Sequence, residues 1–146
     1  MKSTIPWLFV ILLAVGWSLD RAQAPEAHAA HAVADEEVLH YDLHALMDEL
    51  DASGHRWLEF LRVPTLFAGL YALPADATDR QQPHDEDEVY FVAQGRGQIT
   101  AGDTTFAVQP GSVIYVKANV EHRFHDISEK LQLLVFFSEA KATDEN

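Results

Sequence analysis

The sequence predicts an all-β domain, an antiparallel sandwich or barrel, preceded by one short N-terminal α-helix. Short apolar runs separated by turn residues follow one another from Arg56 onward, at the spacing of an antiparallel sheet. Before them, one segment carries apolar residues at helical spacing. The chain has 146 residues, of which 48% are apolar, so it has room for one globular domain with a hydrophobic core.

The first 24 residues have the features of an export signal. Lys2 precedes an apolar run from Ile5 to Trp17, and Ala22-Gln23-Ala24 has the small-x-small pattern that signal peptidases recognise. The run is shorter than the about 20 apolar residues of a membrane span. We therefore expect residues 1–24 to be a signal peptide and the protein to be periplasmic or secreted. The alternative is an uncleaved segment that anchors the domain on the non-cytoplasmic side.

A linker and a helix are predicted next. Residues 25–37 are Ala-rich and acidic and lack apolar periodicity, which indicates a linker. Between residues 38 and 50 the apolar positions fall on one helical face. These positions are Leu39, Leu43, Leu46, Met47 and Leu50. The helix is expected to stop before Ser53-Gly54, because glycine suits a helix C-terminus. Residues 38–146 would form one domain, with a barrel core at about residues 56–138.

Eight or so strands are expected in the barrel. Their predicted ranges are 57–61, 66–73, 89–92, 98–101, 106–108, 112–116, 121–125 and 131–137. Turn residues separate them, among them Pro64, Gly95-Arg96-Gly97, the hairpin signal at 102–105 and Pro110-Gly111.

Charge and cysteine content exclude several classes of partner and site. The formal net charge is −13, from 23 acidic and 10 basic residues, and this field repels nucleic-acid phosphates and anionic lipid headgroups. We therefore expect no nucleic-acid partner and no membrane partner beyond the possible N-terminal anchor. The chain contains no cysteine, so disulfides, thiolate nucleophiles and sulfur-ligated metals are excluded.

Two histidines and one glutamate form the candidate site. His84 and Glu88 lie close together in the sequence, and His122 follows after a strand and turn that begin at Gly111. Two imidazoles and one carboxylate are the ligands of a 2-His-1-carboxylate metal site. For His84 and Glu88 alone a surface ion pair would be the better explanation, so the metal-site prediction depends on His122.

The segments around these residues resemble the two motifs of the cupin superfamily. The first motif, His-x-His-x3-Glu-x6-Gly, falls on Gln82, His84, Glu88 and Gly95. The second, Gly-x5-Pro-x-Gly-x2-His-x3-Asn, falls on Gly111, Lys117, Asn119, His122 and Asp126. The resemblance covers roughly residues 66–138. It implies an antiparallel double-stranded β-helix, the jelly-roll or cupin barrel, and a homodimer.

The resemblance also implies a divalent metal ion held by His84, Glu88 and His122. Gln82 replaces a histidine, and its neutral amide oxygen would be a weak fourth ligand. Fe(II) is favoured for oxygenase chemistry, and Mn²⁺ or Zn²⁺ would also fit. Strand parity favours a partly aromatic pocket, with ordinary core packing as the alternative role of each ring. The candidate pocket residues are Tyr90, Tyr115 and Phe124.

Three functions remain open from the sequence. The leading hypothesis is a small non-haem, metal-dependent dioxygenase-like enzyme that acts on an oxygenated small molecule. A non-catalytic cupin that binds a sugar or carboxylate is the second, and a metal-dependent isomerase or epimerase is the third. No residue is identified as a general base, because roles for Glu86 and Glu88 require geometry.

Overall fold

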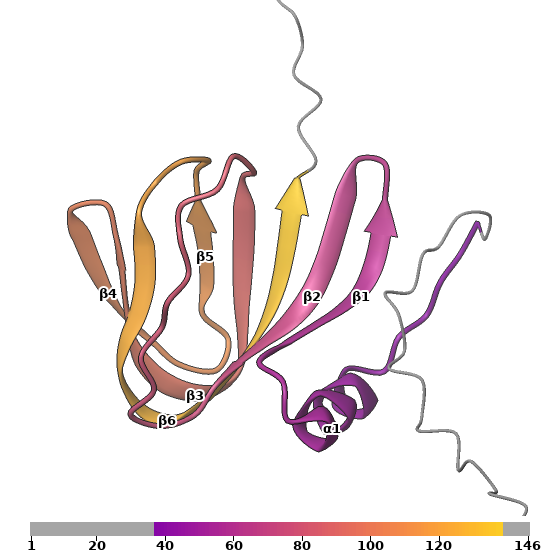
Figure 1. Ribbon diagram of the computed structural model, residues 1–146, viewed down its shortest axis with the longest axis horizontal. Helices are drawn as coiled ribbons and strands as arrows, with labels where there is room; N and C mark the ends of the chain where they lie inside the picture. The colour runs from indigo at the N-terminus through magenta and orange to yellow at the C-terminus, as the bar shows by residue number, and fades with distance from the viewer. Residues whose placement is uncertain (1–36, 139–146) are drawn as a thin grey trace, which may run out of the picture.

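The computed structural model describes residues 37–138, so the predicted signal peptide and all but the last residue of the linker lie outside the described part. One helix and six strands are formed within this range (Figure 1). They are α1 (Leu43–Ser53), β1 (Trp57–Val63), β2 (Leu66–Leu73), β3 (Glu88–Ala101), β4 (Thr104–Val108), β5 (Val113–Val116) and β6 (His122–Ser138). Across residues 37–138, no helix has the length and apolar character needed to cross a bilayer.

Helix α1 begins later than the apolar spacing predicts. The Asp42 side chain accepts a hydrogen bond from the Ala45 backbone N–H at 2.9 Å, and its own backbone is extended, as in an N-cap. The helix ends at Gly54, which adopts the left-handed conformation expected there. Leu46, Met47 and other apolar residues of α1 pack against β1 and β2.

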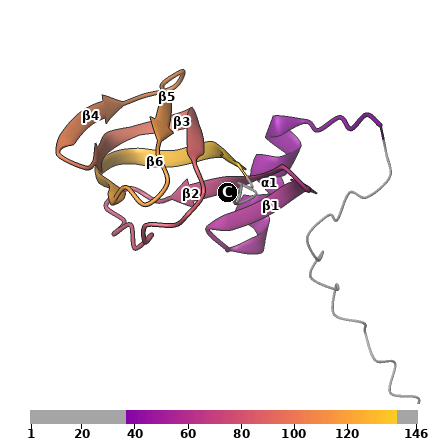
Figure 2. The ribbon, with the colours of Figure 1, turned by 90° about the horizontal axis from the view of Figure 1, so that it is seen from above.

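The strands form an antiparallel sheet that folds over on itself. Their order is β1-β2-β6-β3-β4, and β5 pairs with the first half of β3. Strands β3 and β6 are long and curved, and they pair along most of their length (Figure 1). Seen from above, β3, β4, β5 and β6 surround a common interior, and α1 lies beside β1 at the other end (Figure 2). The predicted double-stranded β-helix is confirmed.

Two pairs of predicted strands are each one continuous strand. The segment Gly95-Arg96-Gly97, predicted as a turn, lies within β3, where the register to β6 shifts repeatedly. Gly95 has a φ of 89°, and a Cβ atom there would collide with the Lys130 backbone. The glycine therefore marks a bulge that bends the strand. Likewise, β6 runs through residues 126–130, where Glu129 pairs with Arg96 of β3 and Ile127 is buried in the core, although the other side chains are polar.

The apolar side chains form two buried clusters. The cluster inside the barrel contains Leu73, Tyr90, Val92, Ile99, Val108, Val116, Phe124, Ile127, Leu131, Leu133 and Val135. The second cluster lies between α1 and the sheet and contains Leu46, Met47, Leu50, Phe60, Ala68, Leu70 and Ala72. Alternate residues of β2 contribute to the two sides, as expected for a strand with apolar contacts on both faces. The candidate site lies at the edge of the first cluster.

Candidate metal centre

Folding of the sheet into two layers brings His84, Glu88 and His122 together. Glu88 opens β3 and His122 opens β6, yet they are not cross-strand partners: Glu88 lies opposite Phe137, and His122 lies opposite Ala101. The two side chains meet because both point into the interior of the folded sheet. One ligand atom from each of the three residues lies within 4.8 Å of the others. The predicted trio is therefore a spatial cluster.

Glu88 and His122 are buried, and the atoms that they turn toward each other lack hydrogen-bond partners within the described part of the chain. The side chains of Glu88 and His122 are 0% and 1% exposed, and that of His84 is 27% exposed. His122 Nε2 lies 2.7 Å and His84 Nε2 lies 3.4 Å from Glu88 Oε1. Neither contact is aligned as a hydrogen bond, and both Glu88 oxygens and His122 Nε2 lack such a partner within residues 37–138. A buried carboxylate in this state is costly unless a cation compensates it, so the donor set fits a divalent metal ion.

The backbone carbonyl of Val120 orients the His122 ring. His122 Nδ1 lies 2.7 Å from this oxygen, which can only accept a hydrogen bond, so Nδ1 carries a proton. Nε2 is then the atom directed at the cluster, as in metal-bound histidines whose other nitrogen donates to a carbonyl. Burial lowers the pKa of His122, but the contacts with Glu88 and Val120 and the nearby carboxylates raise it by more, so its pKa lies above the ordinary value.

The loop that carries His84 is held by the turn before β6. The Asn119 backbone N–H donates to the His84 carbonyl at 2.6 Å, and the Ala118 N–H donates to Asp87 Oδ1 at 2.8 Å. Asn119 adopts a left-handed conformation, with a φ of 63°, where the family motif has glycine. His84 Nδ1 faces Glu86 Oε2 at 3.3 Å. These contacts bring both motif segments to one end of the barrel.

An aromatic cavity of about 210 Å³ lies beside the trio. It is lined by Trp57, Tyr71, Gln81, Tyr90, Val135 and Phe137. The Phe137 ring lies 5.3 Å from the His84 ring, and the Tyr90 ring lies 6.1 Å from the His122 ring, measured between centroids. The cavity therefore lies next to two of the three candidate ligands, although none of the three lines it.

The predicted pocket residues have three different locations. Tyr90 lines the cavity, as predicted, and Phe124 is buried behind it, with ring centroids 5.1 Å apart. The prediction for Tyr115 is wrong, because its side chain is 60% exposed. Tyr115 pairs with Val89, which alternates with the inward-facing Glu88 and Tyr90, so both members of this pair face outward.

The Gln82 side chain is held by the backbone of its own loop, and its neighbour Gln81 lines the aromatic cavity instead. The Gln82 amide nitrogen donates to the backbone oxygens of Arg80 and Gln81, and the side chain is exposed. Gln81 accepts a hydrogen bond from the Tyr90 hydroxyl at 3.0 Å. The sequence could not identify Gln81, because residues 74–87 form no strand and strand parity does not apply to them.

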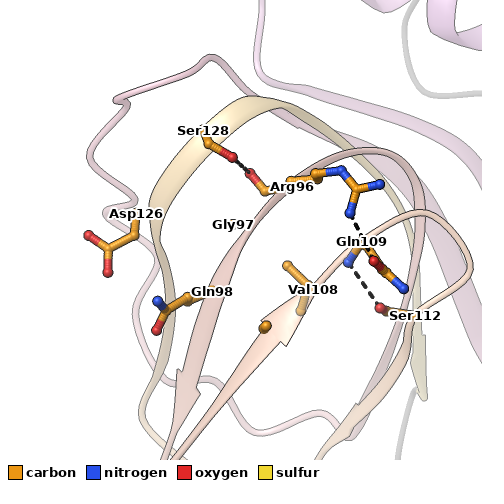
Figure 3. A pocket seen from close by; sticks show the side chains of 9 residues that line it. Arg96, Gly97, Gln98, Val108, Gln109, Ser112, Asp126 and Ser128 are labelled. Atoms are coloured by element: carbon orange, nitrogen blue, oxygen red, sulfur yellow. Dashed lines mark hydrogen bonds between the residues drawn. The ribbon is translucent and has the colours of Figure 1, made fainter.

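A larger cavity of about 520 Å³ lies away from the trio, at the bend of β3 (Figure 3). Four of its polar lining residues, Arg96, Gln109, Ser112 and Ser128, bond to one another. Arg96 Nη1 donates to Gln109 Oε1 at 2.8 Å, the Gln109 N–H donates to Ser112 Oγ at 3.0 Å, and Ser128 Oγ donates to the Arg96 carbonyl at 3.4 Å. Because Arg96, Gln109, Ser112 and Ser128 already have partners, and no ring of this lining lies against a histidine of the trio, we do not take this cavity as the candidate site.

Comparisons with known proteins agree with the motifs. The family model described as Cupin domain matches residues 69–137. An uncharacterized protein from Streptomyces coelicolor is 52% identical over 96 residues, which are 63% of this chain and 91% of that protein.

Two solved structures illustrate the likeness in fold. KdgF from a Halomonas species is 16% identical, with a TM-score of 0.52, over 62% of this chain and 91% of that one. The DMSP lyase DddQ from Ruegeria pomeroyi is 18% identical, with a TM-score of 0.53, over 60% of this chain and 49% of that one. At these identities the likeness concerns the fold alone.

Proposed function

This chain belongs to the cupin superfamily, and we propose that it is a small metal-dependent enzyme of the dioxygenase type that acts on an oxygenated small molecule. The observation that carries the proposal is the convergence of His84, Glu88 and His122 within 4.8 Å at the edge of an aromatic cavity. Three protein ligands would leave positions on a bound ion for other molecules, as in non-haem oxygenase sites.

Two imidazoles and one carboxylate suit Fe(II), the ion we favour, and they also suit Mn²⁺ and Zn²⁺. When bound there, the ion would supply Lewis acidity toward a substrate oxygen and open positions for a second oxygen ligand. Glu88 contributes one negative charge at a position closed to water. Val120 keeps the His122 proton on Nδ1 and so leaves Nε2 free to ligate.

The cavity supplies the binding surface for the organic substrate. Its aromatic walls exclude water beside the trio, which strengthens electrostatic interactions at the site. Burial and the Glu88 charge raise the pKa of Tyr90 far above its ordinary value. The Tyr90 hydroxyl therefore stays neutral and donates its hydrogen bond to Gln81.

A second candidate is a barrel that binds a small ligand without metal. The 2.7 Å contact between His122 Nε2 and Glu88 Oε1 supports it, because a protonated imidazole and a carboxylate would form a buried ion pair at this distance. In that case His122 would keep both ring protons, and the cavity would act as a simple binding site.

Metal analysis of the purified full-length protein separates the two candidates. We expect about one divalent ion per chain after reconstitution with Fe(II), Mn²⁺ or Zn²⁺, a higher unfolding temperature, and oxygen consumption by the Fe(II) form with diols or diketones. His84→Ala and His122→Ala should each abolish metal binding. His125→Ala is the matched control, because His125 lies on the same strand and contacts Thr100 and Asp126 instead of the trio.

The enzymatic proposal would be contradicted if no ion is bound and none of the three metals changes the unfolding temperature. That result would favour the metal-free barrel. Bound metal without oxygen consumption would favour an isomerase or epimerase, because those reactions use the same Lewis acidity without dioxygen. Full metal content in His84→Ala would show that the ligand set is wrong.

We further propose that the mature protein acts outside the cytoplasm as a homodimer. The apolar run of residues 5–17 and the Ala22-Gln23-Ala24 pattern support export. The exposed apolar side chains Val113 and Tyr115 offer a surface for a second copy. Mass spectrometry of the N-terminus and sedimentation of the protein test the two parts; a cytoplasmic chain that retains Met1, or a monomer at micromolar concentration, would contradict them.

A further inference from the structure

We propose that Gln81 determines substrate specificity: its side-chain NH2 group binds the carbonyl oxygen of a small, flat, uncharged substrate whose apolar body lies in the aromatic cavity. The inference rests on the proposed function in that it assigns a substrate class to the same site. It depends on contacts of Gln81 and on the cavity walls, which are separate from the three candidate metal ligands.

The Gln81 side chain has one satisfied end and one unsatisfied end. Its Oε1 accepts the hydrogen bond from the Tyr90 hydroxyl at 3.0 Å. Its Nε2 is buried and has no hydrogen-bond partner in the described part of the chain. A buried donor without an acceptor is unfavourable, so the amide protons should find an acceptor when the protein works. The cavity, which Gln81 itself lines, is the place from which that acceptor can come.

The orientation of the amide is determined by its neighbours. The Tyr90 hydroxyl donates to Oε1, which leaves Nε2 in the remaining direction. The Gln81 backbone N–H donates to Asp79 Oδ1 at 3.1 Å, which anchors the residue.

Asp79 does not accept a hydrogen bond from the Gln81 side-chain amide. Its Oδ1 also accepts from the Tyr71 hydroxyl at 2.8 Å, and its Oδ2 accepts from the Phe124 N–H at 2.9 Å. The same bonds connect the Gln81 loop to β2 and β6. Gln81 is thus held in place before any substrate arrives, which is favourable for specific binding.

The shape of the cavity restricts the rest of the substrate. At about 210 Å³ it is smaller than the roughly 300–1,000 Å³ of typical drug-sized pockets, so it suits about one ring. Trp57 packs edge-on to Phe137 with centroids 5.9 Å apart, and Phe137 stacks on Phe67 at 4.4 Å. Walls made of rings favour a flat apolar body, and they disfavour a charged group, which would lose its hydration there.

A pair of probes that differ in the acceptor tests the inference. Fluorine NMR titrations of the full-length protein would compare para-fluoroacetophenone, which has a carbonyl oxygen, with para-ethylfluorobenzene, which lacks it. We expect the ketone to bind on the order of tenfold more tightly, the value of about one hydrogen bond. In Gln81→Leu this ratio should fall to about one while the hydrocarbon still binds, because the apolar walls remain.

Gln82→Leu is the matched control, because the neighbouring amide bonds only to the backbone of its own loop. It should keep the wild-type ratio. Three results would overturn the inference: an unchanged ratio in Gln81→Leu, an equal loss in Gln82→Leu, or no binding of either probe to the wild-type protein.

Repeating the titration in the presence of EDTA separates this inference from the proposed function. If the tenfold preference persists without metal while no oxygen is consumed by the Fe(II) form, Gln81 recognises a carbonyl and the dioxygenase proposal fails. If the Fe(II) form consumes oxygen but the two probes bind equally, the enzymatic proposal stands and the role of Gln81 is wrong.

Discussion

His122 Nε2 and Glu88 Oε1 face each other at 2.7 Å across the interior of the barrel, although the two residues have different cross-strand partners. Both atoms are buried and neither has an aligned hydrogen bond within residues 37–138. Whether a proton or a cation lies between them decides the charge of the site. The metal affinity and the pH dependence of stability both depend on this contact.

Glu88→Gln should remove metal binding without destabilising the metal-free protein. The substitution deletes a buried charge that no hydrogen bond compensates, and the amide can donate to His122 Nε2. In the wild type, an ion at about a hundred times its Kd should add about 2.7 kcal/mol to the free energy of unfolding. Thermal unfolding with and without Zn²⁺ measures both effects. A Zn²⁺ shift of wild-type size in Glu88→Gln would contradict the assignment of Glu88 as a ligand.

The stability of the metal-free protein should fall as the pH rises through the pKa of His122. Burial lowers this pKa, but Glu88 and the other contacts raise it to a net value above that of the unfolded chain. The stabilisation is therefore fully present below the unfolded pKa of about 6.5 and is lost as the pH rises through the higher folded pKa. Urea unfolding between about pH 5 and about pH 9 measures it.

The affinity for a metal ion should rise as the pH rises, because His122 ligates through its unprotonated Nε2. In His122→Ala, the free energy of unfolding should no longer show the pH dependence that comes from the contact between His122 and Glu88. In His125→Ala, this pH dependence should remain. The same pH profile in His122→Ala and the wild type would show that the contact with Glu88 does not raise the pKa of His122.

Gly95→Ala should destabilise the barrel much more than Gly111→Ala. Both glycines have a φ near 90°, so alanine is strained at each position. A Cβ atom at Gly95 would also collide with the Lys130 backbone, whereas nothing lies within 4 Å of a Cβ atom at Gly111. We expect a loss of about 1–2 kcal/mol at Gly111 and on the order of 4 kcal/mol or more at Gly95, measured by urea unfolding. Equal losses would argue against tight packing at the bulge.

Asp79→Ala should be strongly destabilising. It would leave the Tyr71 hydroxyl and the Phe124 and Gln81 backbone N–H groups without their acceptor. Each unsatisfied donor costs about 1–3 kcal/mol, so we expect a loss of about 3–5 kcal/mol. Asp103→Ala, in the exposed turn between β3 and β4, is the control and should change stability by less than about 0.5 kcal/mol. Chemical denaturation of both variants measures the difference. A loss of stability at Asp79 no larger than at Asp103 would show that the three hydrogen bonds accepted by Asp79 do not stabilise the fold.

The sequence predicted the elements well where side chains alternate along a regular strand. The parity that placed Tyr90 and Phe124 in the interior is correct, because both lie in strands that continue on either side. The prediction that Tyr115 lines the pocket was wrong, because it was made without knowledge of its cross-strand partner Val89. Strand breaks were overestimated at Gly95, because a glycine cluster has the same composition in a turn and in a bulge.

By itself, the sequence determined the class of fold and the three candidate ligands, because apolar periodicity, turn residues and the motif spacing are local properties of the chain. Only the tertiary structure decided which glutamine faces the cavity. Gln81 and Gln82 are adjacent and identical in chemistry, and their directions follow from hydrogen bonds to Tyr90 and Asp79 on one side and to the loop backbone on the other. These hydrogen bonds join residues two to nine positions apart within and beside an irregular loop. Neither helical nor strand periodicity assigns a side-chain direction in such a loop, so the sequence pattern could not separate the two glutamines.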